Sequence, residues 1–151
     1  MKPRRPPLQL LSPIHRASRQ IGTYLEGRCT ELGVLPQEGH LLTYVASYSP
    51  AAVGDLGRIF GLKGSTLTSM LDRLEERRLL ARRLNPDDRR SFLVELTPAG
   101  EEIAAALRKE IDALEAEVLR RLDKRDLAGF HAVLDTLGAA TGVDLRKGEE
   151  S

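Results

Sequence analysis

Small hydroxyl side chains are concentrated in one short stretch near the middle of the chain. They are Ser65, Thr66, Thr68 and Ser69. Hydroxyls donate and accept hydrogen bonds on short stems, which suits close contact with base edges and phosphate groups. Lys63 and Arg73 lie on either side of the stretch and add positive charge. These residue types predict contact with a polyanion, although a solvated helix that only covers a core would show a similar polar face.

A helix over residues 62–78 would separate these hydroxyls from an apolar stripe. The stripe consists of Leu67, Met70, Leu71 and Leu74, which recur at helical spacing. Ser65 and Ser69 fall on the opposite face, and Thr66 and Thr68 on its flanks. The free backbone N–H groups at the start of such a helix also favour an anion.

A basic β-hairpin is predicted directly after this helix. Residues 80–84 and 92–96 form two short apolar segments, and Asn85-Pro86-Asp87-Asp88 between them is typical turn sequence. Arg89 and Arg90 then lie at the tip, where a guanidinium group suits the narrow minor groove of DNA. We expect Asp88 to hold the Arg90 side chain through a bidentate pair. A helix followed by an arginine-tipped hairpin predicts a winged helix-turn-helix that binds duplex DNA, whereas the hairpin alone also fits a charged surface loop.

The run NPDDRRSFLVELTPAG, residues 85–100, resembles the wing signature of the MarR (multiple-antibiotic-resistance regulator) family. Residues 53–56 resemble the family's first helix-turn-helix helix, and residues 65–75 resemble its recognition helix. The similarity is continuous from about Leu35 to Gly100, and the combined pattern is specific.

The resemblance implies a homodimeric transcription regulator, usually a repressor, which a small aromatic or anionic ligand or thiol oxidation releases from a palindromic operator. The implied fold is mainly α-helical with a small β-hairpin wing, in which dimerisation helices from both ends of the chain flank a winged helix-turn-helix core. Arg90 would enter the minor groove with support from Asp88, and Arg89 would contact a phosphate. The implied major-groove residues are Ser65, Thr66, Thr68, Ser69 and Arg73, with Lys63 reaching a phosphate.

Three positions depart from the family pattern. Lys63 stands where a small capping hydroxyl is common, and it cannot accept hydrogen bonds from backbone N–H groups. Arg78 replaces the glycine between helix and wing, so a left-handed backbone there would cost roughly 1 kcal/mol. Asn85 replaces the usual turn aspartate, which is a well-tolerated exchange.

Long apolar stripes predict helical arms on both sides of the lobe. We expect Ser12 to cap the first helix, and Thr97 and Asp123 to cap the later two. A small lobe cannot cover these stripes, so they predict either a homodimer or, less economically, a helical bundle within one chain. The expected organisation is one MarR-type domain over residues 1–151, with dimerisation regions at 12–33 and 98–141 and a DNA-binding lobe at 35–97.

The first two helices also carry candidate effector contacts. They are Tyr24, Arg28, His40 and Tyr44, of which the cationic groups suit a carboxylate and the tyrosines an aromatic ring. Each also fits an ordinary packing or surface role. Cys29 lies on the apolar stripe of its helix, where burial would make the thiol inert. Thiol-redox sensing through Cys29 and a winged helix that docks a protein partner are the alternatives left open.

Composition, charge and the motifs present narrow the class of protein further. The chain has 151 residues, 41% of them hydrophobic and 30% charged, with a formal net charge of +1 and one cysteine. Basic residues nevertheless cluster between Lys63 and Arg90, so the distribution of charge favours nucleic acid more than its sum. No nucleophile–base pair, metal-ligand spacing or phosphate loop is evident, so we expect no enzyme activity, metal or cofactor. The basic start MKPRRPP precedes no long apolar run, which predicts a cytoplasmic protein without a membrane segment.

Overall fold

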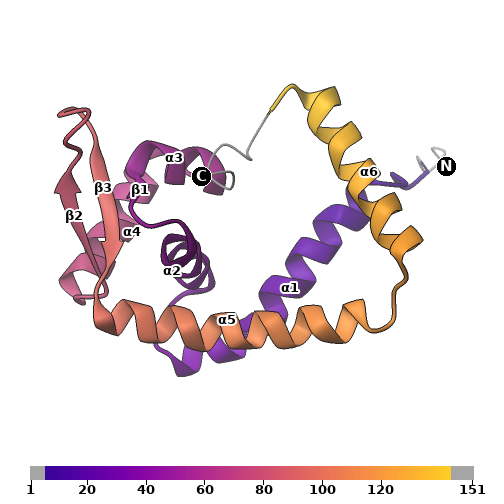
Figure 1. Ribbon diagram of the computed structural model, residues 1–151, viewed down its shortest axis with the longest axis horizontal. Coiled ribbons are helices and arrows are strands. Elements are labelled where there is room, and N and C mark those ends of the chain that lie inside the picture. Colours follow the sequence, from indigo (N-terminus) through magenta and orange to yellow (C-terminus); the bar gives the residue numbers. More distant parts are fainter. Residues whose placement is uncertain (1–5, 144–151) are drawn as a thin grey trace, which may run out of the picture.

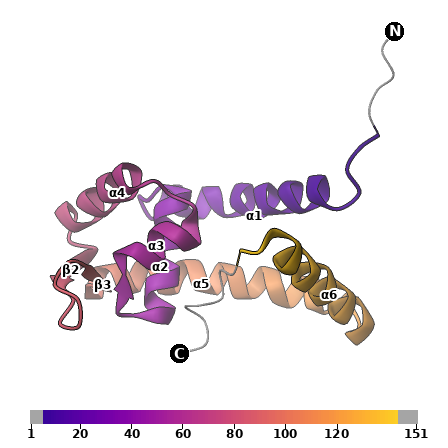
Figure 2. The same cartoon turned by 90° about the horizontal axis from the view of Figure 1, so that it is seen from above.

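The computed structural model describes residues 6–143, in which six helices accompany a three-stranded antiparallel sheet. The elements in chain order are α1 (Leu11–Glu31), α2 (Pro36–Tyr48), β1 (Ala51–Ala52), α3 (Val53–Phe60), α4 (Gly64–Glu76), β2 (Leu80–Leu84), β3 (Phe92–Leu96), α5 (Pro98–Leu119) and α6 (Lys124–Thr141). The hairpin of β2 and β3 lies at one end of the molecule and α6 at the other, with α5 extending between them (Figure 1). Turned by 90°, the same structure shows α1 and α5 running along its length (Figure 2). The predicted fold class is therefore confirmed.

The three arm helices begin close to the predicted caps, and two of the three caps are confirmed. The Thr97 side chain accepts a hydrogen bond from the Gly100 N–H at the start of α5, and Asp123 accepts from two N–H groups of α6. The predicted cap at Ser12 is wrong. The Ile14 N–H already bonds to the carbonyl of Leu10 at 3.0 Å, so α1 begins at Leu11 and Ser12 lies inside its first turn.

The core lies between the helices and the sheet of the winged-helix lobe, and it extends onto the adjoining parts of α1 and α5. Leu41 and Leu42 of α2, Leu56 of α3 and Val94 of β3 are fully buried there. β3 is the central strand, and the two-residue strand β1 pairs with it through Ala51 and Val94. The sequence pattern did not predict β1, because two alanines carry no alternation of apolar and polar residues.

The turn between α4 and the wing is in close contact with the start of α5. Arg78 takes the left-handed conformation expected at the glycine position, with a φ of 58°, and its carbonyl accepts a 2.6 Å hydrogen bond from Thr97 Oγ1. Gly100 lies against the same turn, since a Cβ added to it would come within 1.9 Å of the Leu79 carbonyl oxygen. The start of α5 is thereby held against the end of α4, so the long arm helix and the lobe meet at a close contact.

Candidate nucleic-acid interface

The two faces of α4 are separated as the sequence predicted. The apolar stripe is buried, with Leu67, Met70, Leu71 and Leu74 all at most 3% exposed. The hydroxyl residues are exposed on the outer side. Within residues 6–143, no hydrogen bond occupies the side chains of Ser65, Thr66, Thr68 or Ser69. The outer face of α4 is therefore free to contact a ligand as large as a duplex.

The beginning of α4 is open to solvent. Lys63 is the N-cap residue in an extended conformation, and no side chain accepts a hydrogen bond there. Both Lys63 and Gly64 are exposed. The first N–H groups of this 13-residue helix are thus available to an anion beside a cationic side chain.

The wing strands begin and end where the sequence predicted, and the side chain of Asn85 organises the turn between them. Its Nδ2 donates to Ser91 Oγ at 3.1 Å, while its Oδ1 accepts from the Asp87 N–H at 3.0 Å. An aspartate could not make the first of these hydrogen bonds, because an ionised carboxylate has no donor. The exchange to Asn85 therefore adds an interaction to the turn.

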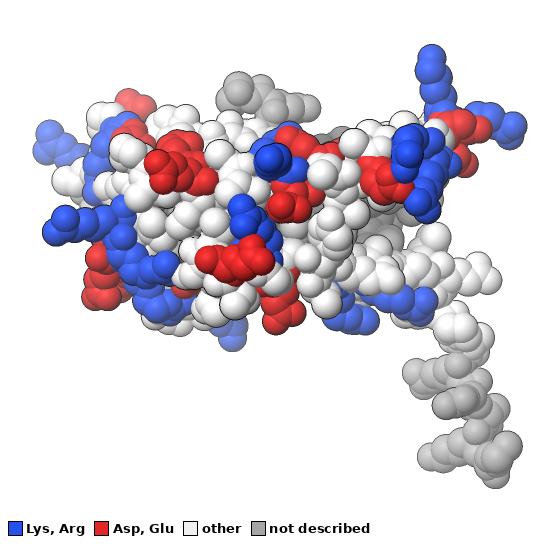
Figure 3. Space-filling model, turned by 90° about the horizontal axis from the view of Figure 1, so that it is seen from below, with Lys and Arg blue, Asp and Glu red and all other residues white. Residues whose placement is uncertain are grey.

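The tip arginines extend from this turn. Arg89 and Arg90 are exposed, and no ion pair within the described part of the chain holds either guanidinium group. Lys and Arg side chains are prominent at the wing end of the molecule (Figure 3). The predicted pair between Asp88 and the Arg90 guanidinium is not formed. Asp88 Oδ1 instead accepts the Arg90 backbone N–H at 3.0 Å, because the tight turn brings that N–H closer than the long side chain, so Asp88 shapes the backbone that presents Arg90.

Arg82 ties the wing to α4. Its NH2 donates to Asp72 Oδ1 at 2.5 Å and to Glu75 Oε2 at 2.6 Å, and its backbone N–H also donates to Glu75. Hydrogen bonds from Arg82 lower the pKa of Glu75, and the same bonds raise the pKa of Arg82. Both acids lie on the helix and Arg82 on strand β2, so the ion-pair cluster fixes the angle between wing and helix.

The predicted effector residues do not converge on one cavity. Tyr44 stacks in an aromatic group with Tyr48 and Phe60, at centroid distances of 4.6 and 5.6 Å. Arg28 is paired with Glu31 at 2.8 Å, and His40 is exposed on α2.

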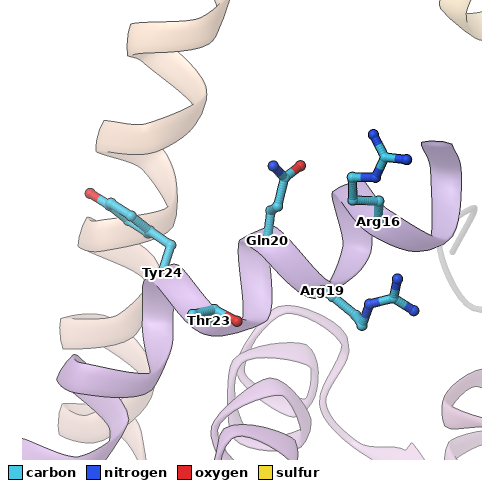
Figure 4. Close-up of a pocket in the computed structure, with 5 residues that line it drawn as sticks. All are labelled: Arg16, Arg19, Gln20, Thr23 and Tyr24. Atoms are coloured by element: carbon cyan, nitrogen blue, oxygen red, sulfur yellow. The ribbon is translucent and has the colours of Figure 1, made fainter.

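Tyr24 is the one residue of the four that lines a described hollow, and it lines two. One is a shallow depression of about 540 Å³, and its other lining residues, Arg16, Arg19, Gln20 and Thr23, also lie on α1 (Figure 4). The other is an apolar cleft of about 910 Å³ between α1, α5 and α6. Arg16 and Arg19 were not predicted as site residues, although their spacing along α1 is visible in the sequence.

The Cys29 thiol is packed inside the lobe. The residue is 1% exposed, and burial followed by the nearby charge of Glu26 raises the pKa of its thiol. A raised pKa lowers the fraction of reactive thiolate. This environment argues against Cys29 as a peroxide sensor.

One family model matches the central part of the chain. The model of the MarR family matches residues 32–91, which span the winged-helix lobe as far as the wing tip. This part of the chain is therefore similar to the MarR family.

Curated helix-turn-helix (HTH) regulators are also similar to the chain. The HTH-type transcriptional regulator Hpr of Geobacillus sp. (strain WCH70) is 29% identical over 102 residues, which are 66% of this chain and 51% of Hpr. The HTH-type transcriptional regulator YcgE of Bacillus subtilis (strain 168) is 29% identical over 80 residues, 50% of this chain and 52% of YcgE. The chain thus spans about half the length of both relatives.

Solved structures share the fold. S. aureus MepR in its DNA-binding conformation superimposes with a TM-score of 0.81 at 18% identity, covering 89% of this chain and 99% of MepR. The MepR–DNA complex gives a TM-score of 0.76 at 18% identity, with the same coverage of 89% and 99%. NadR in complex with 4-hydroxyphenylacetate gives 0.78 at 19% identity, covering 91% of this chain and 97% of NadR.

No helix within residues 6–143 is long and apolar enough to cross a lipid bilayer. In the same range, His, Cys, Asp and Glu side chains form no group of three or more that would hold a metal ion.

The ion-pair cluster around Arg82 makes a prediction about stability. Replacing Arg82 with alanine should lower the free energy of unfolding by about 1–3 kcal/mol at neutral pH, because two carboxylates lose a shared charged donor. Since the folded-state pKa of Glu75 is lowered, its contribution is complete above the ordinary glutamate pKa, about 4.3, and is lost as the pH falls through the lowered value. Urea unfolding of wild type and variant should therefore differ by a constant amount above about pH 6 and converge in acid.

The neighbouring residue provides the matched control. Arg83 makes an exposed pair with Glu95 across the hairpin at 2.9 Å, so Arg83→Ala should cost only about 0–1 kcal/mol. An Arg82→Ala cost equal to that of Arg83→Ala, or one that is the same at every pH, would contradict the assigned cluster.

Proposed function

We propose that this chain is a DNA-binding repressor that acts as a homodimer on a palindromic operator and is released by a small aromatic or anionic ligand. The observation that carries the proposal is the exposed hydroxyl face of α4 beside two wing arginines without ion-pair partners in residues 6–143. A helix of this width fits the major groove of B-DNA, and a hairpin beside it reaches the backbone or minor groove. The solved complex of MepR with DNA supports the proposal, because MepR has the same fold.

The proposed contacts divide by groove. Arg90 enters the minor groove from a backbone shaped by Asp88, and Arg89 contacts a neighbouring phosphate. Lys63 reaches a phosphate near the N-terminus of α4. The proposed major-groove contacts are Ser65, Thr66, Thr68, Ser69 and Arg73.

Replacement of the minor-groove arginine tests the DNA interface. Arg90→Ala should weaken binding by about 1–3 kcal/mol and reduce the salt slope of log K by about 1, because one cationic contact is lost. The measurement is fluorescence anisotropy on a duplex that the wild-type protein selects from a random library, titrated at several salt concentrations.

Arg125 provides the control for charge alone. It is exposed on α6, at the end of the molecule opposite the wing, so Arg125→Ala should leave DNA affinity nearly unchanged. Equal affinity of the wild type and Arg90→Ala would refute the wing assignment. If no duplex is selected at all, the winged helix docks a protein partner instead, since an apolar interface would show little salt dependence.

The arms provide the support for a dimer. α1, α5 and α6 enclose an apolar cleft of about 910 Å³, lined among others by Ile21, Leu114 and Phe130. No residue of α6 is buried, and Leu122 and Phe130 are 43% and 56% exposed. Open apolar surfaces of this size mark interfaces, so we assign the cleft to a second copy of the chain. Two-fold symmetry would then place half-sites about 10 bp apart, centre to centre.

Charges placed in the cleft should separate the copies. The double variant Leu122→Asp/Phe130→Asp should sediment as a monomer in analytical ultracentrifugation where the wild type is a dimer, because two carboxylates cannot be buried without partners. Leu84 is equally exposed on wing strand β2, at 57%, and Leu84→Asp should leave the dimer intact. A monomeric wild type, or a dimeric double variant, would exclude this interface.

The cavity on α1 is the proposed effector site. Arg16 and Arg19 have no ion-pair partners within residues 6–143, and they line the depression on α1 together with Tyr24. Two guanidinium groups and a phenol suit an aromatic carboxylate. NadR, of the same fold, is solved with 4-hydroxyphenylacetate, a ligand of this class. Arg28, His40 and Tyr44 stay predictions as further ligand contacts.

Addition of 4-hydroxyphenylacetate tests this site. The compound should weaken binding to the selected duplex, and Arg19→Ala should abolish both this effect and the heat of binding in calorimetry, because the carboxylate loses a cationic partner. Arg108, which is exposed on α5 and paired with Asp112, is the control position. Binding that is the same in Arg19→Ala and in Arg108→Ala would move the site elsewhere, and DNA affinity indifferent to the compound would exclude this ligand class.

A further inference from the structure

Glu38 is the one charged residue that is buried among residues 6–143, and the DNA interface described so far does not use it. It is 3% exposed and stands in the first turn of α2. Its Oε2 accepts the backbone N–H of Leu35 at 2.9 Å, which caps the start of that helix. Burial of a carboxylate with only one N–H partner would cost a large desolvation free energy. The other partners of Glu38 must therefore offset that cost.

Those partners are Arg73 on α4 and Arg77, the C-cap residue of α4. Glu38 Oε1 accepts a hydrogen bond from Arg73 Nε at 3.3 Å, and Arg77 NH1 lies 3.9 Å from Oε2. Arg77 also lies against the turn before α2, since a Cβ on Gly33 would come within 3.5 Å of its NH2. The beginning of α2 and the second half of α4 are therefore joined through a single buried carboxylate.

The contact constrains how Arg73 presents its guanidinium group. Only Nε faces Glu38, and the side chain of Arg73 is still half exposed, at 50%. Within the described residues, no hydrogen bond occupies its NH1 or NH2. The hydrogen bond at Nε restricts the rotation of the planar guanidinium and leaves its two terminal nitrogens able to donate to another group.

We infer that Glu38 is a positioning residue for DNA recognition, which holds Arg73 through Nε so that NH1 and NH2 are aimed at the major groove before DNA arrives. The inference rests on the proposed function, in which Arg73 contacts DNA. An arginine in this geometry reads a guanine edge or grips a phosphate with two parallel hydrogen bonds. Fixing the side chain in advance removes part of the conformational entropy that binding would otherwise cost.

Electrostatics alone predicts the opposite sign, which makes the inference testable. A carboxylate near a DNA-binding helix repels phosphates, so its neutralisation should strengthen binding. Glu38→Gln keeps the size of the side chain but removes the charge and one acceptor oxygen. Under the positioning role it should weaken binding to the library-selected duplex about tenfold, within the range of one bidentate contact. Glu76→Gln removes an exposed charge from α4, the helix that carries Arg73, and it should leave binding unchanged or tighter.

A double-mutant cycle isolates the path through Arg73. Glu38→Gln should cause no further loss of affinity in an Arg73→Ala background, whereas a general defect of the fold would persist there. Arg73→Lys keeps the charge and leaves the Leu35 cap intact but lacks the fork. It should therefore lose about as much affinity as Glu38→Gln, which keeps the test valid if Glu38→Gln unfolds in circular dichroism.

A readout without DNA completes the experiment. In NMR spectra of the free protein, the Arg73 Nε–H should give a resolved, slowly exchanging signal that Glu38→Gln removes and Glu76→Gln preserves. Affinity in Glu38→Gln equal to or above that of the wild type, or additive losses in the cycle, would overturn the inference while leaving DNA binding in place. If the wild type selects no duplex, the proposed function fails and Glu38 is reduced to an internal ion pair, which the NMR signal would still report.

Discussion

The packing of the α4 apolar stripe into the lobe is the constraint on which the interface depends. Burial of a leucine or methionine contributes about 1.5–3 kcal/mol, so the three leucines and one methionine of the stripe hold the helix firmly against α3 and the sheet. Successive residues turn by about 100° around a helix, which means that this contact also decides what faces outward. Rotating α4 by one residue would expose part of the apolar stripe and bury hydroxyl groups without hydrogen-bond partners. Both changes would lower the stability of the fold. The chemistry shown to a ligand is therefore a consequence of the core.

Burial fixes which side of the helix faces out but not its angle to neighbouring elements, because the hydrophobic effect has no direction. Directional ties complete the geometry at the edges of the lobe. Arg82 joins the wing to α4, Glu38 joins α2 to α4, and the 2.6 Å hydrogen bond between Thr97 and the Arg78 carbonyl joins α5 to the turn after α4. Each tie involves a charged group or a cap, whose hydrogen bonds are stronger and more specific in orientation than a contact between methyl groups. Helix and wing are thereby held as one unit.

The sequence predicted those features that arise from local periodicity and turn chemistry. The buried stripe of α4 and the bounds of both wing strands are confirmed, since each follows from residues within a few positions of one another. At Arg78 the sequence indicated only what a left-handed backbone would cost, and the structure has that backbone. The strand β1 was missed because its partner lies about 40 residues away and two alanines carry no pattern. The contact of Glu38 with Arg73 crosses 35 residues, and no one-dimensional pattern shows it, although a glutamate three residues after a helix start was a visible signal for the cap. The prediction that Asp88 pairs with the Arg90 guanidinium was wrong for another reason. Closeness in sequence shows that Asp88 can reach Arg90, but not whether it bonds to the side chain or to the backbone N–H.

The low net charge of the chain and the exposed apolar surface of α1, α5 and α6 both bear on how strongly the protein can bind DNA. With a net charge of only +1, a single lobe attracts DNA poorly, and the acids Asp72, Glu76 and Asp87 lie among its cations. Nonspecific affinity is therefore low, which favours discrimination but leaves one half-site with little binding energy. Two lobes held rigidly together add their contacts without a second loss of translational entropy. Under the proposed dimer, the apolar area that α1, α5 and α6 leave exposed supplies the association energy that this weakly charged lobe lacks, so the chemistry of the arms and of the interface would have to change together.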